Sequence, residues 1–391
     1  MSKLLLIFGI LISLLIRSYF IFNGSEVADI HSLKEMGELT LRGVNPFYAL
    51  SYNSYPPLAL YLEAYTVTLS QNLDTPFYIL TKLWPNLADL LIGIILYLFL
   101  IKKGTKPILA TIWSLIFLLN PISIIISSAH GQIDSIPTFF IILAIYLLEF
   151  KQSKIYFFLT ALVLGISASI KPNPIILWPF FLLFMKTKFL NKALFSLILI
   201  SPLALSLLPF YLEASSILGK IFSYSGANDF GLAAVIKMHY FQSEASLNPP
   251  IMSDLLRISK FTFLIGLIFL IFFYTKSKNL ILGCLGAYLL FLTIYFGVSA
   301  QYLSWVLPFA VLAKDKMIVP FSISATIALL GFYFYFNPTI LLSQFSAILP
   351  YQAIFIPIYT LGNLLLWIIT AIWTVKVLKN VIIPHNYASS K

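Results

Sequence analysis

The chain has 391 residues, of which 60% are hydrophobic and only 10% are charged, and its mean hydropathy is +0.94. This composition excludes an ordinary soluble domain and is typical of a protein that crosses a membrane many times. A net charge of +11 would suggest nucleic acid in a soluble protein, but here the lysines concentrate in short loops between apolar runs. Cys284 is the only cysteine, which excludes an internal disulfide and a thiolate metal site.

Apolar runs of roughly 20 residues, the length that crosses a bilayer, recur along the chain. The first run is followed by further spans and by no small-x-small cleavage site, so we expect a retained helix rather than a signal peptide. We find no internal repeat and no low-complexity linker, which predicts a single all-α membrane domain over 1–391. The twelve candidate spans are 4–22, 78–101, 107–128, 133–150, 154–170, 173–185, 193–212, 258–275, 279–298, 302–313, 317–337 and 353–375.

The segment 57–72 is ambiguous because it is short and contains Glu63. Lysine placement decides its course, since cytoplasmic loops carry an excess of Lys and Arg close to the spans. If 57–72 does not cross, every lysine cluster falls on the side of Lys3 and both termini are cytoplasmic. We therefore expect a juxtamembrane or re-entrant helix there, within an outer loop over 23–77, and a second outer loop over 213–257. The clusters are Lys102, Lys103 and Lys106; Lys151 and Lys154; Lys186, Lys188 and Lys192; Lys276 and Lys278; Lys314 and Lys316; Lys376 and Lys379.

The first outer loop begins with an amphipathic segment. Apolar residues recur at helical spacing between Ile30 and Leu41, which predicts a helix lying on the outer membrane surface. For Glu35 and Glu38, a solvated face of that helix is the favoured explanation. Asp29 lies just outside the end of the first span, where a lipid-borne substrate would arrive, so a functional and a purely structural explanation both stay open.

A second polar stretch, His130-Gly-Gln-Ile-Asp134, joins two predicted spans. Asp134 fits the N-cap of the following helix, with Pro137 in the first turn, and that role alone would explain it. A His and an Asp at a membrane-embedded corner also suit a hydrogen-bonding site. A metal site is disfavoured because the two side chains are too few ligands.

Lys171 stands in a short outer-side corner, against the sorting rule for lysine. A cation placed there is expected to bind an anion, most simply a phosphate. Arg42 and Arg257 are further outer-side cations, for which snorkelling to lipid headgroups is the alternative. Snorkelling is the favoured explanation for Lys82 and Lys260.

Two charged residues lie inside predicted spans. Arg17, in the first span, is expected to snorkel outward. Asp89 lies about two turns from Lys82 and is expected to be a buried structural partner of that lysine.

Four groups of short motifs together resemble the GT-C superfamily of membrane glycosyltransferases. The pattern looks most like the bacterial and archaeal mannosyltransferases that use polyprenyl-phosphate sugars, and more distantly like the first glycosylphosphatidylinositol mannosyltransferase. The motifs are Asp29 with Gly43-Val-Asn-Pro46-Phe-Tyr48 and Tyr55-Pro-Pro-Leu58; Asn120-Pro121 through His130-Gly-Gln132-Ile-Asp134; Lys171-Pro-Asn-Pro174; and Gln301-Tyr302-x-x-Trp305-x-x-Pro308.

The resemblance implies transfer of a hexose such as mannose from a polyprenyl-phosphate carrier to a hydroxyl of a glycan, lipid or protein acceptor, with inversion and without a metal or other cofactor. The family's acid pair is absent here, because Ala28 precedes Asp29, so Asp29 alone is the expected catalytic base. Partial desolvation is expected to raise its pKa. The partners implied are membrane lipids and these substrates rather than nucleic acid. The expected location is the non-cytoplasmic face of a prokaryotic plasma membrane.

Substrate-binding roles follow from the same resemblance. Cations would neutralise the departing phosphate, and aromatic rings would stack on sugars, although interfacial Tyr and Trp are more often membrane anchors. The 213–257 loop, with Tyr224, Asn228, Asp229 and His239, is expected to cover the acceptor. The residues expected to bind substrate are Lys171, Asp134, His130, Gln132, Arg42, Arg257, Tyr55, Gln301, Tyr302 and Trp305.

Two other classes of protein fit an apolar chain of this kind. A transporter or lipid-linked glycan flippase commonly shows inverted repeats and charges near the midplane, whereas here no repeat is found and the polar stretches gather on one side. A structural membrane scaffold would not explain Lys171 at an outer corner. The one-sided distribution of polar groups therefore favours an enzyme working at the outer surface.

Overall fold

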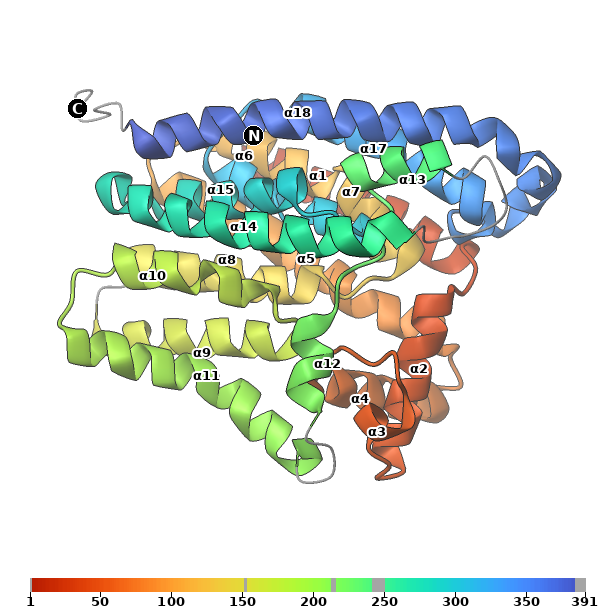
Figure 1. Ribbon diagram of the computed structural model, residues 1–391, viewed down its shortest axis with the longest axis horizontal. Helices are drawn as coiled ribbons and strands as arrows, with labels where there is room; N and C mark the ends of the chain where they lie inside the picture. Colours follow the sequence, from red (N-terminus) through yellow and green to blue (C-terminus); the bar gives the residue numbers. More distant parts are fainter. Residues whose placement is uncertain (1, 151–152, 212–215, 241–249, 384–391) are drawn as a thin grey trace.

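The computed structural model describes residues 2–150, 153–211, 216–240 and 250–383, and these residues are 83% helical with no strand. Most of the long helices run side by side in one direction, whereas α2 runs across them at one end of the molecule (Figure 1). In chain order the helices are α1 (Ser2–Asn23), α2 (Ala28–Leu41), α3 (Pro46–Ala49), α4 (Pro57–Leu73), α5 (Phe77–Lys102), α6 (Pro107–Leu118), α7 (Pro121–Ile124), the π-helix η1 (Ile125–His130), α8 (Ser135–Phe150), α9 (Lys154–Ile170), η2 (Asn173–Leu177), α10 (Trp178–Phe184), α11 (Phe189–Tyr211), α12 (Ile217–Ser223), α13 (Leu232–Tyr240), α14 (Pro250–Ser277), α15 (Leu280–Ile294), η3 (Ala300–Ser304), α16 (Leu307–Leu312), α17 (Ile318–Phe336), η4 (Pro338–Ile340), η5 (Ser343–Phe355) and α18 (Ile356–Ile382).

Six helical segments are long and apolar enough to cross a membrane, and a bent pair, α6 with Pro121–His130, makes a seventh if it counts as one span. A helix lies at each of the other predicted spans too, but these are shorter: Ser135–Phe150, Lys154–Ile170, Asn173–Phe184, Leu280–Ile294 and Ala300–Leu312. The all-helical character is confirmed, and the long apolar helices are compatible with a multi-pass membrane protein. The count of twelve spans stays a prediction.

Asn-Pro pairs begin three of the short helical segments. In each, the asparagine side chain accepts a hydrogen bond from the backbone N–H two residues on, namely Phe47, Ile122 or Thr339. Proline then occupies the first helical position, where its missing N–H is no loss. These caps fix where the chain turns at the ends of the long helices.

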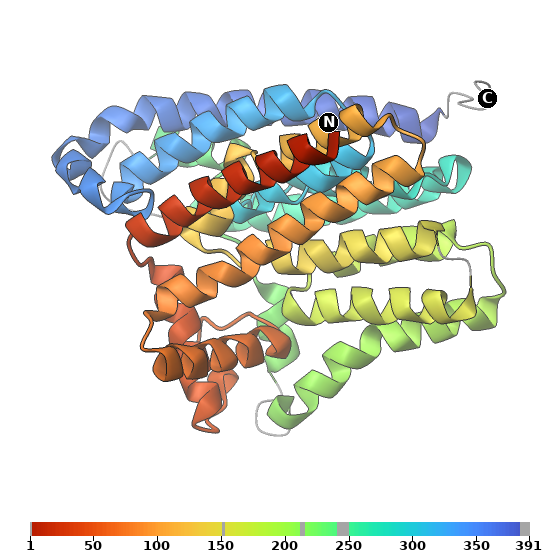
Figure 2. The same cartoon turned by 180° about the vertical axis from the view of Figure 1, so that it is seen from behind.

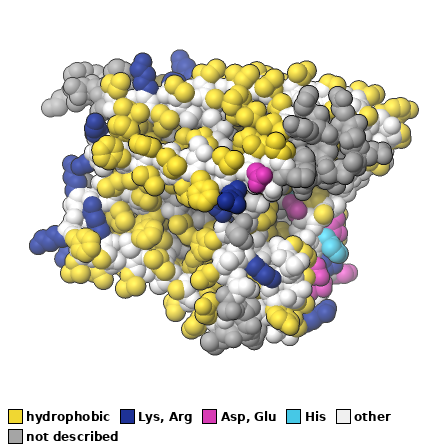
Figure 3. All heavy atoms as spheres, viewed as in Figure 1, with side chains coloured by type: hydrophobic (Ala, Val, Ile, Leu, Met, Phe, Trp, Pro, Cys, Tyr) yellow, Lys and Arg dark blue, Asp and Glu magenta, His cyan; other side chains and the backbone are white. Residues whose placement is uncertain are grey.

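Charge is distributed unevenly between the two ends of the molecule. On the face shown in Figure 3, Lys and Arg side chains gather mainly toward the left-hand end, and the acids and histidine lie toward the right. The left-hand end carries the lysine-rich connections after α8, α10 and α14, and the right-hand end carries α2 and α3 (Figure 1). The asymmetry expected from the lysine pattern is therefore present along the direction of the long helices.

A buried ion pair ties α1 to α5. Arg17 is 1% exposed and donates to Asp89 Oδ2 at 2.8 Å, to Ser123 Oγ at 2.7 Å and to the Leu118 carbonyl at 3.2 Å. The prediction that Arg17 snorkels outward is wrong, and Asp89 has Arg17 rather than Lys82 as its partner. Removing either charge would leave the other uncompensated inside the bundle, which costs about 3–5 kcal/mol.

The predicted amphipathic helix exists as α2, but its apolar face packs on protein. Ile30, Leu33 and Met36 are buried, and α2 lies against α4. The two backbones approach closely at Gly37, where a Cβ would lie 2.8 Å from the Glu63 carbonyl oxygen. The segment predicted to form the first outer loop is thus a helical layer in which α4 supports α2.

Glu63 is buried at the base of this layer. Its Oε2 accepts from Thr81 Oγ1 at 3.0 Å, and its Oε1 has no hydrogen-bond partner among the described residues. The helix that carries it, α4, is not one of the candidate spans. Burial raises the pKa of Glu63 to about 8, so the folded protein keeps this carboxyl protonated at neutral pH.

We expect Glu63→Gln to stabilise the protein, and increasingly so as the pH rises. The unfolded chain ionises this glutamate above a pH of about 4.3, whereas the folded chain holds the proton up to a pH of about 8. Wild-type stability is therefore lost over that window, and the amide variant avoids the loss. The gain in unfolding free energy should grow from under about 1 kcal/mol at pH 5 to a few kcal/mol near pH 8, measured by unfolding in detergent. A gain independent of pH would contradict the prediction; Glu38→Gln serves as the control.

Cysteine labelling tests the side on which α4 lies. Ser51 and Gln71 are exposed at the two ends of the α3–α4 region, and cysteines placed there should both react with an impermeant reagent added outside intact cells. A cysteine at Lys316, also exposed, should react only after the membrane is opened. Native Cys284 is buried and should stay silent. Reaction of the Gln71 site only in opened membranes would show that α4 crosses.

Candidate functional site

A cavity of about 590 Å³ opens beside the start of α2. That volume lies in the range of small-molecule and cofactor sites. Its wall combines α2, the Tyr-rich segment before α4, the corner after α9, parts of α12 and α14, and the segment from α15 to η3. The predicted site residues that line it are Asp29, Tyr55, Lys171, Gln301, Tyr302 and Trp305.

Asp29 projects from the first turn of α2 and is held from behind by the 130–134 corner. His130 Nε2 lies 3.1 Å from Asp29 Oδ2, and the Gln132 side-chain amide also donates to that oxygen. The side chain of Asp29 remains 53% exposed. The corner thus fixes one edge of the carboxylate and leaves the group open to the cavity.

His130 is anchored on its other ring nitrogen. Nδ1 lies 2.6 Å from the hydroxyl of Tyr333, a buried residue of α17. An ionised carboxylate can only accept hydrogen bonds, so Nε2 carries the hydrogen that it shares with Asp29. The Tyr333 hydroxyl at Nδ1 and the carboxylate at Nε2 together hold the ring in one orientation.

The pKa of Asp29 is lowered from its ordinary value of 3.8, contrary to the prediction that it is raised. Burial of the carboxyl does act to raise the pKa. The hydrogen bond and charge of His130, the amide of Gln132 and the nearby ammonium of Lys171 together outweigh it. Asp29 is therefore ionised at neutral pH, which is the form that can accept a proton.

Asp134 is completely buried behind the opposite part of the cavity wall. Its Oδ2 accepts from Lys171 Nζ at 2.6 Å and its Oδ1 accepts from Trp305 Nε1 at 2.7 Å. The side chain is therefore committed to two cavity-lining groups rather than to capping α8, the structural role considered from the sequence. Asp134 does not line the cavity and acts by positioning Lys171 and Trp305.

Lys171 occupies the break between α9 and η2, where its extended backbone ends the helix. Its ammonium lies 5.5 Å from the ring centre of Tyr302 and 5.8 Å from that of Tyr55. These cation–π contacts and the bond to Asp134 hold the ammonium at the wall of the cavity. Because Asp134 compensates the charge of Lys171, the main contribution of this lysine to the cavity is an oriented hydrogen-bond donor rather than an uncompensated positive charge.

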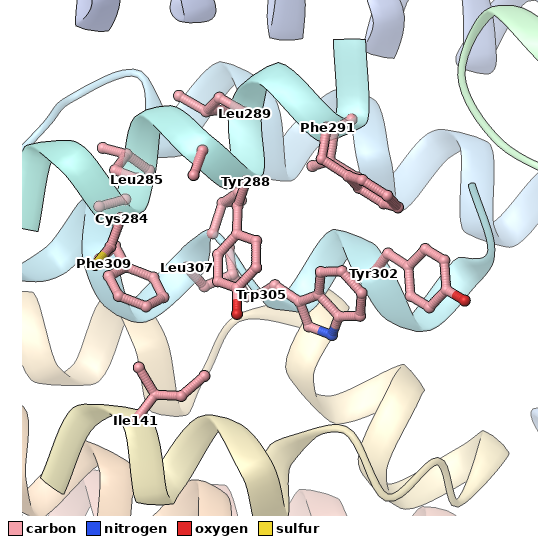
Figure 4. Close-up of a cluster of buried hydrophobic side chains, with 14 of the residues drawn as sticks. Ile141, Cys284, Leu285, Tyr288, Leu289, Phe291, Tyr302, Trp305, Leu307 and Phe309 are labelled. Carbon is pink, nitrogen blue, oxygen red and sulfur yellow. The ribbon is translucent and has the colours of Figure 1, made fainter. Parts of the chain in front are cut away.

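Aromatic rings form one wall. Tyr302 and Trp305 lie with ring centres 4.3 Å apart and planes 30° apart, and Phe291 of α15 lies 5.6 Å from Trp305. Figure 4 shows these rings side by side beneath α15, with Tyr288 next to them. Apolar faces of this kind can stack on the C–H surface of a sugar, or on an isoprenoid.

Two predicted site residues lie elsewhere. Arg42 is exposed on the far end of α2, where it pairs loosely with Glu38 at 3.7 Å. Arg257 is exposed on α14, and neither arginine lines the cavity. The residue of α14 that does reach it is Lys260, one turn further on, whose Nζ lies 3.4 Å from the Phe222 carbonyl.

Lys82 also differs from its prediction. Instead of snorkelling it is 0% exposed, and its ammonium has no hydrogen-bond partner among the described residues. Its carbon chain runs under Gly131, where a Cβ would lie 2.9 Å from Lys82 Cγ. Gly131 has a φ of +85°, so both its backbone conformation and its surroundings require glycine.

The 213–257 segment contributes Tyr224 to the cavity, and its predicted role in covering an acceptor stays a prediction. The following residues dock onto the 297–299 segment, where Ala227 N donates to Ser299 Oγ and Asp229 N to the Val298 carbonyl. Burial raises the pKa of Asp229, opposed by Lys237 at 2.8 Å and reinforced by the negative charge of Asp29. Asp229 is thus a second carboxyl in electrostatic reach of Asp29; the side chain of His239 lies outside the described residues.

The sequence matches no family model and no curated protein. Among the described residues, no group of three or more His, Cys, Asp or Glu side chains clusters as metal ligands would. The site combines an ionised, oriented carboxylate with two ammonium groups on the wall of one cavity. Aromatic rings form one side of that cavity.

We expect Asp134 and Lys171 to behave as one unit in a double-mutant cycle. Asp134→Asn and Lys171→Met should each destabilise the protein, because each leaves a buried charge without its partner. The double variant should lose less than the sum, with a coupling energy of about 1–3 kcal/mol in unfolding free energy. Additive losses in detergent unfolding would show that the two residues are energetically independent.

Proposed function

We propose that the protein is a GT-C-type glycosyltransferase that transfers a sugar, such as mannose, from a polyprenyl-phosphate carrier to an acceptor hydroxyl. The observation that carries this proposal is the placement of Asp29 on the same cavity wall as Lys171 and Lys260. Such a transfer needs a base for the incoming hydroxyl and positive charge for the departing phosphate. One cavity offers both.

In this reaction Asp29 accepts the proton of the acceptor hydroxyl as the oxygen attacks the anomeric carbon. The bond from that carbon to the phosphate oxygen breaks on the opposite face, so the configuration inverts. His130 and Gln132 hold one carboxylate oxygen, which leaves the other free to meet the acceptor. The lowered pKa of Asp29 supports this role, because the carboxylate is ready in its proton-accepting form.

The leaving phosphate monoester gains negative charge as the bond breaks. Lys260 forms no ion pair with a described carboxylate, whereas Lys171 is compensated by Asp134. We therefore assign the main charge-neutralising role to Lys260 and a directional hydrogen bond to Lys171. Arg42 and Arg257, which lie off the cavity, carry no role in this scheme.

The wall formed by α14 suits a lipid-borne donor. Phe263 and Leu264 line the cavity next to Lys260, and the outer surface of α14 continues apolar with Ile268 and Phe269, which are 66% and 60% exposed. An isoprenoid chain can lie along this surface while its phosphate reaches Lys260. A freely soluble donor would not need such a surface.

The membrane arrangement that accompanies this proposal has twelve crossings and both termini in the cytoplasm. The cavity then opens on the non-cytoplasmic side, most simply of a prokaryotic plasma membrane. Two features support it: helices lie at all twelve predicted segments, and lysines concentrate at the end away from α2. The acceptor would enter from the aqueous side, beneath the residues that follow α12.

Asp29→Asn should lower the rate of sugar transfer by about two to four orders of magnitude, the usual contribution of a general base. The amide keeps the shape of the side chain but cannot accept the proton. The measurement uses purified protein with a synthetic polyprenyl-phosphate sugar, and donor binding is determined separately. Donor affinity should change little.

Glu38→Gln is the matched control, since Glu38 lies on the same helix, away from the cavity. It should leave the rate within about twofold of wild type. Near wild-type transfer by Asp29→Asn would refute the assignment of the base. Movement of labelled lipid across vesicles without any glycosidic product would instead identify a transporter.

A further inference from the structure

A second cavity, of about 1030 Å³, lies at the lysine-rich end of the molecule. It is formed by the connection between α10 and α11, the start of α9 and the end of α14. These segments reach the left-hand end of the ribbon in Figure 1, far from α2 and the proposed active site. Five lysines line it: Lys154, Lys186, Lys188, Lys192 and Lys278.

Among the residues that the structure describes, no acidic side chain lines this cavity. None of its five lysines forms an ion pair with a carboxylate of the described residues. Two other lysines near this end are compensated: Lys103 pairs with Glu149, and Lys376 pairs with Asp315 at 2.7 Å. The cavity therefore concentrates positive charge that only an external anion can neutralise.

The positive-inside rule explains why lysines occur at this end but not why five of them converge on one hollow. Sorting during insertion depends on charge near the spans and would be served equally by lysines spread around the rim. Here residues from three separate stretches of the chain, represented by Lys154, Lys188 and Lys278, face one volume. Ammonium groups that share a cavity repel one another, so the arrangement favours a bound anion.

The surroundings indicate that this anion belongs to a lipid. Leu183 and Met185 form an apolar part of the lining. Phe189 and Leu190, at the start of α11, are 85% and 68% exposed just beside it. A headgroup phosphate in the cavity would place its acyl chains against these side chains, whereas a free phosphate would leave them without a role.

We propose that this cavity binds the phosphate group of an anionic phospholipid of the lysine-rich side of the membrane. Each ammonium donates hydrogen bonds to phosphate oxygens, and the lipid tails pack along α11. This site is distinct from the proposed active site and does not depend on the proposed reaction. It would anchor the α9–α11 part of the bundle to one leaflet.

The test measures lipid binding to the purified full-length protein in neutral detergent. Phosphatidylglycerol and phosphatidylcholine with identical acyl chains are titrated, and the bound lipids are counted by mass spectrometry of the intact complex. Wild type should bind phosphatidylglycerol at least about tenfold more tightly. The variant K188Q/K192Q should lose roughly thirtyfold of that affinity, since each lysine near an anionic headgroup contributes about a factor of five.

K314Q/K316Q is the matched control: both lysines are exposed at the same end but do not line the cavity. It should bind phosphatidylglycerol as wild type does, and all three proteins should unfold at the same temperature without added lipid. Unchanged phosphatidylglycerol binding by K188Q/K192Q, or an equal loss in the control, would overturn the proposal. Inorganic pyrophosphate binding as tightly as the lipid would overturn the assignment to a lipid and leave a free phosphate as the ligand; weak competition at millimolar concentration supports the lipid.

Discussion

The buried carboxylate of Asp134 links three parts of the chain that lie far apart in sequence. It is completely buried at the start of α8, and it binds Lys171 after α9 and Trp305 after η3. A buried carboxylate is stable only when its charge and its lone pairs are satisfied. These two bonds therefore fix the positions of the Lys171 ammonium and the Trp305 indole, both of which line the cavity.

The same five-residue corner also positions the opposing charge. His130 and Gln132 bind the carboxylate of Asp29, whereas Asp134, two residues further on, binds the ammonium of Lys171. The corner is preceded by a π-helical turn and reverses direction at Gly131. π-helical turns are frequent at functional sites because they re-aim side chains within a helix. The corner thus contacts both charged groups, Asp29 at the start of α2 and Lys171 at the end of α9.

The sequence predicts the elements well and the orientation of single side chains poorly. Apolar runs, Asn-Pro caps and the lysine pattern are local signals, and they place a helix at every expected span. Asp29 and Lys171 could be identified because each lies next to a break between apolar runs and away from the lysine-rich loops. By contrast, choosing Lys260 over Arg257 as the cavity cation depends on the rotation of α14 about its axis, and an all-round apolar helix does not reveal that rotation.

The predictions for charged residues inside the spans were also wrong, for a related reason. Arg17 is buried because it pairs with Asp89. The two residues are 72 positions apart in the sequence, so no local sequence pattern predicts the contact. Lys82 was expected at the membrane surface because its length allows it to snorkel. Its burial depends instead on Gly131, whose lack of a side chain leaves room for the carbon chain of the lysine. Both cases show long-range geometry overriding a reasonable local preference.

The Arg17–Asp89 pair also has a consequence for how the protein is made. Arg17 emerges from the ribosome 72 residues before its partner, which at about 5–20 residues per second is an interval of roughly 4–14 s. During that time α1 must sit in the membrane or its insertion machinery with an unpaired arginine, whose long side chain can reach the headgroups from near the end of the helix. Docking of α1 against α5 through this pair can therefore be completed only after Asp89 has been synthesised, so the burial of Arg17 is a separate step that follows the synthesis of α1.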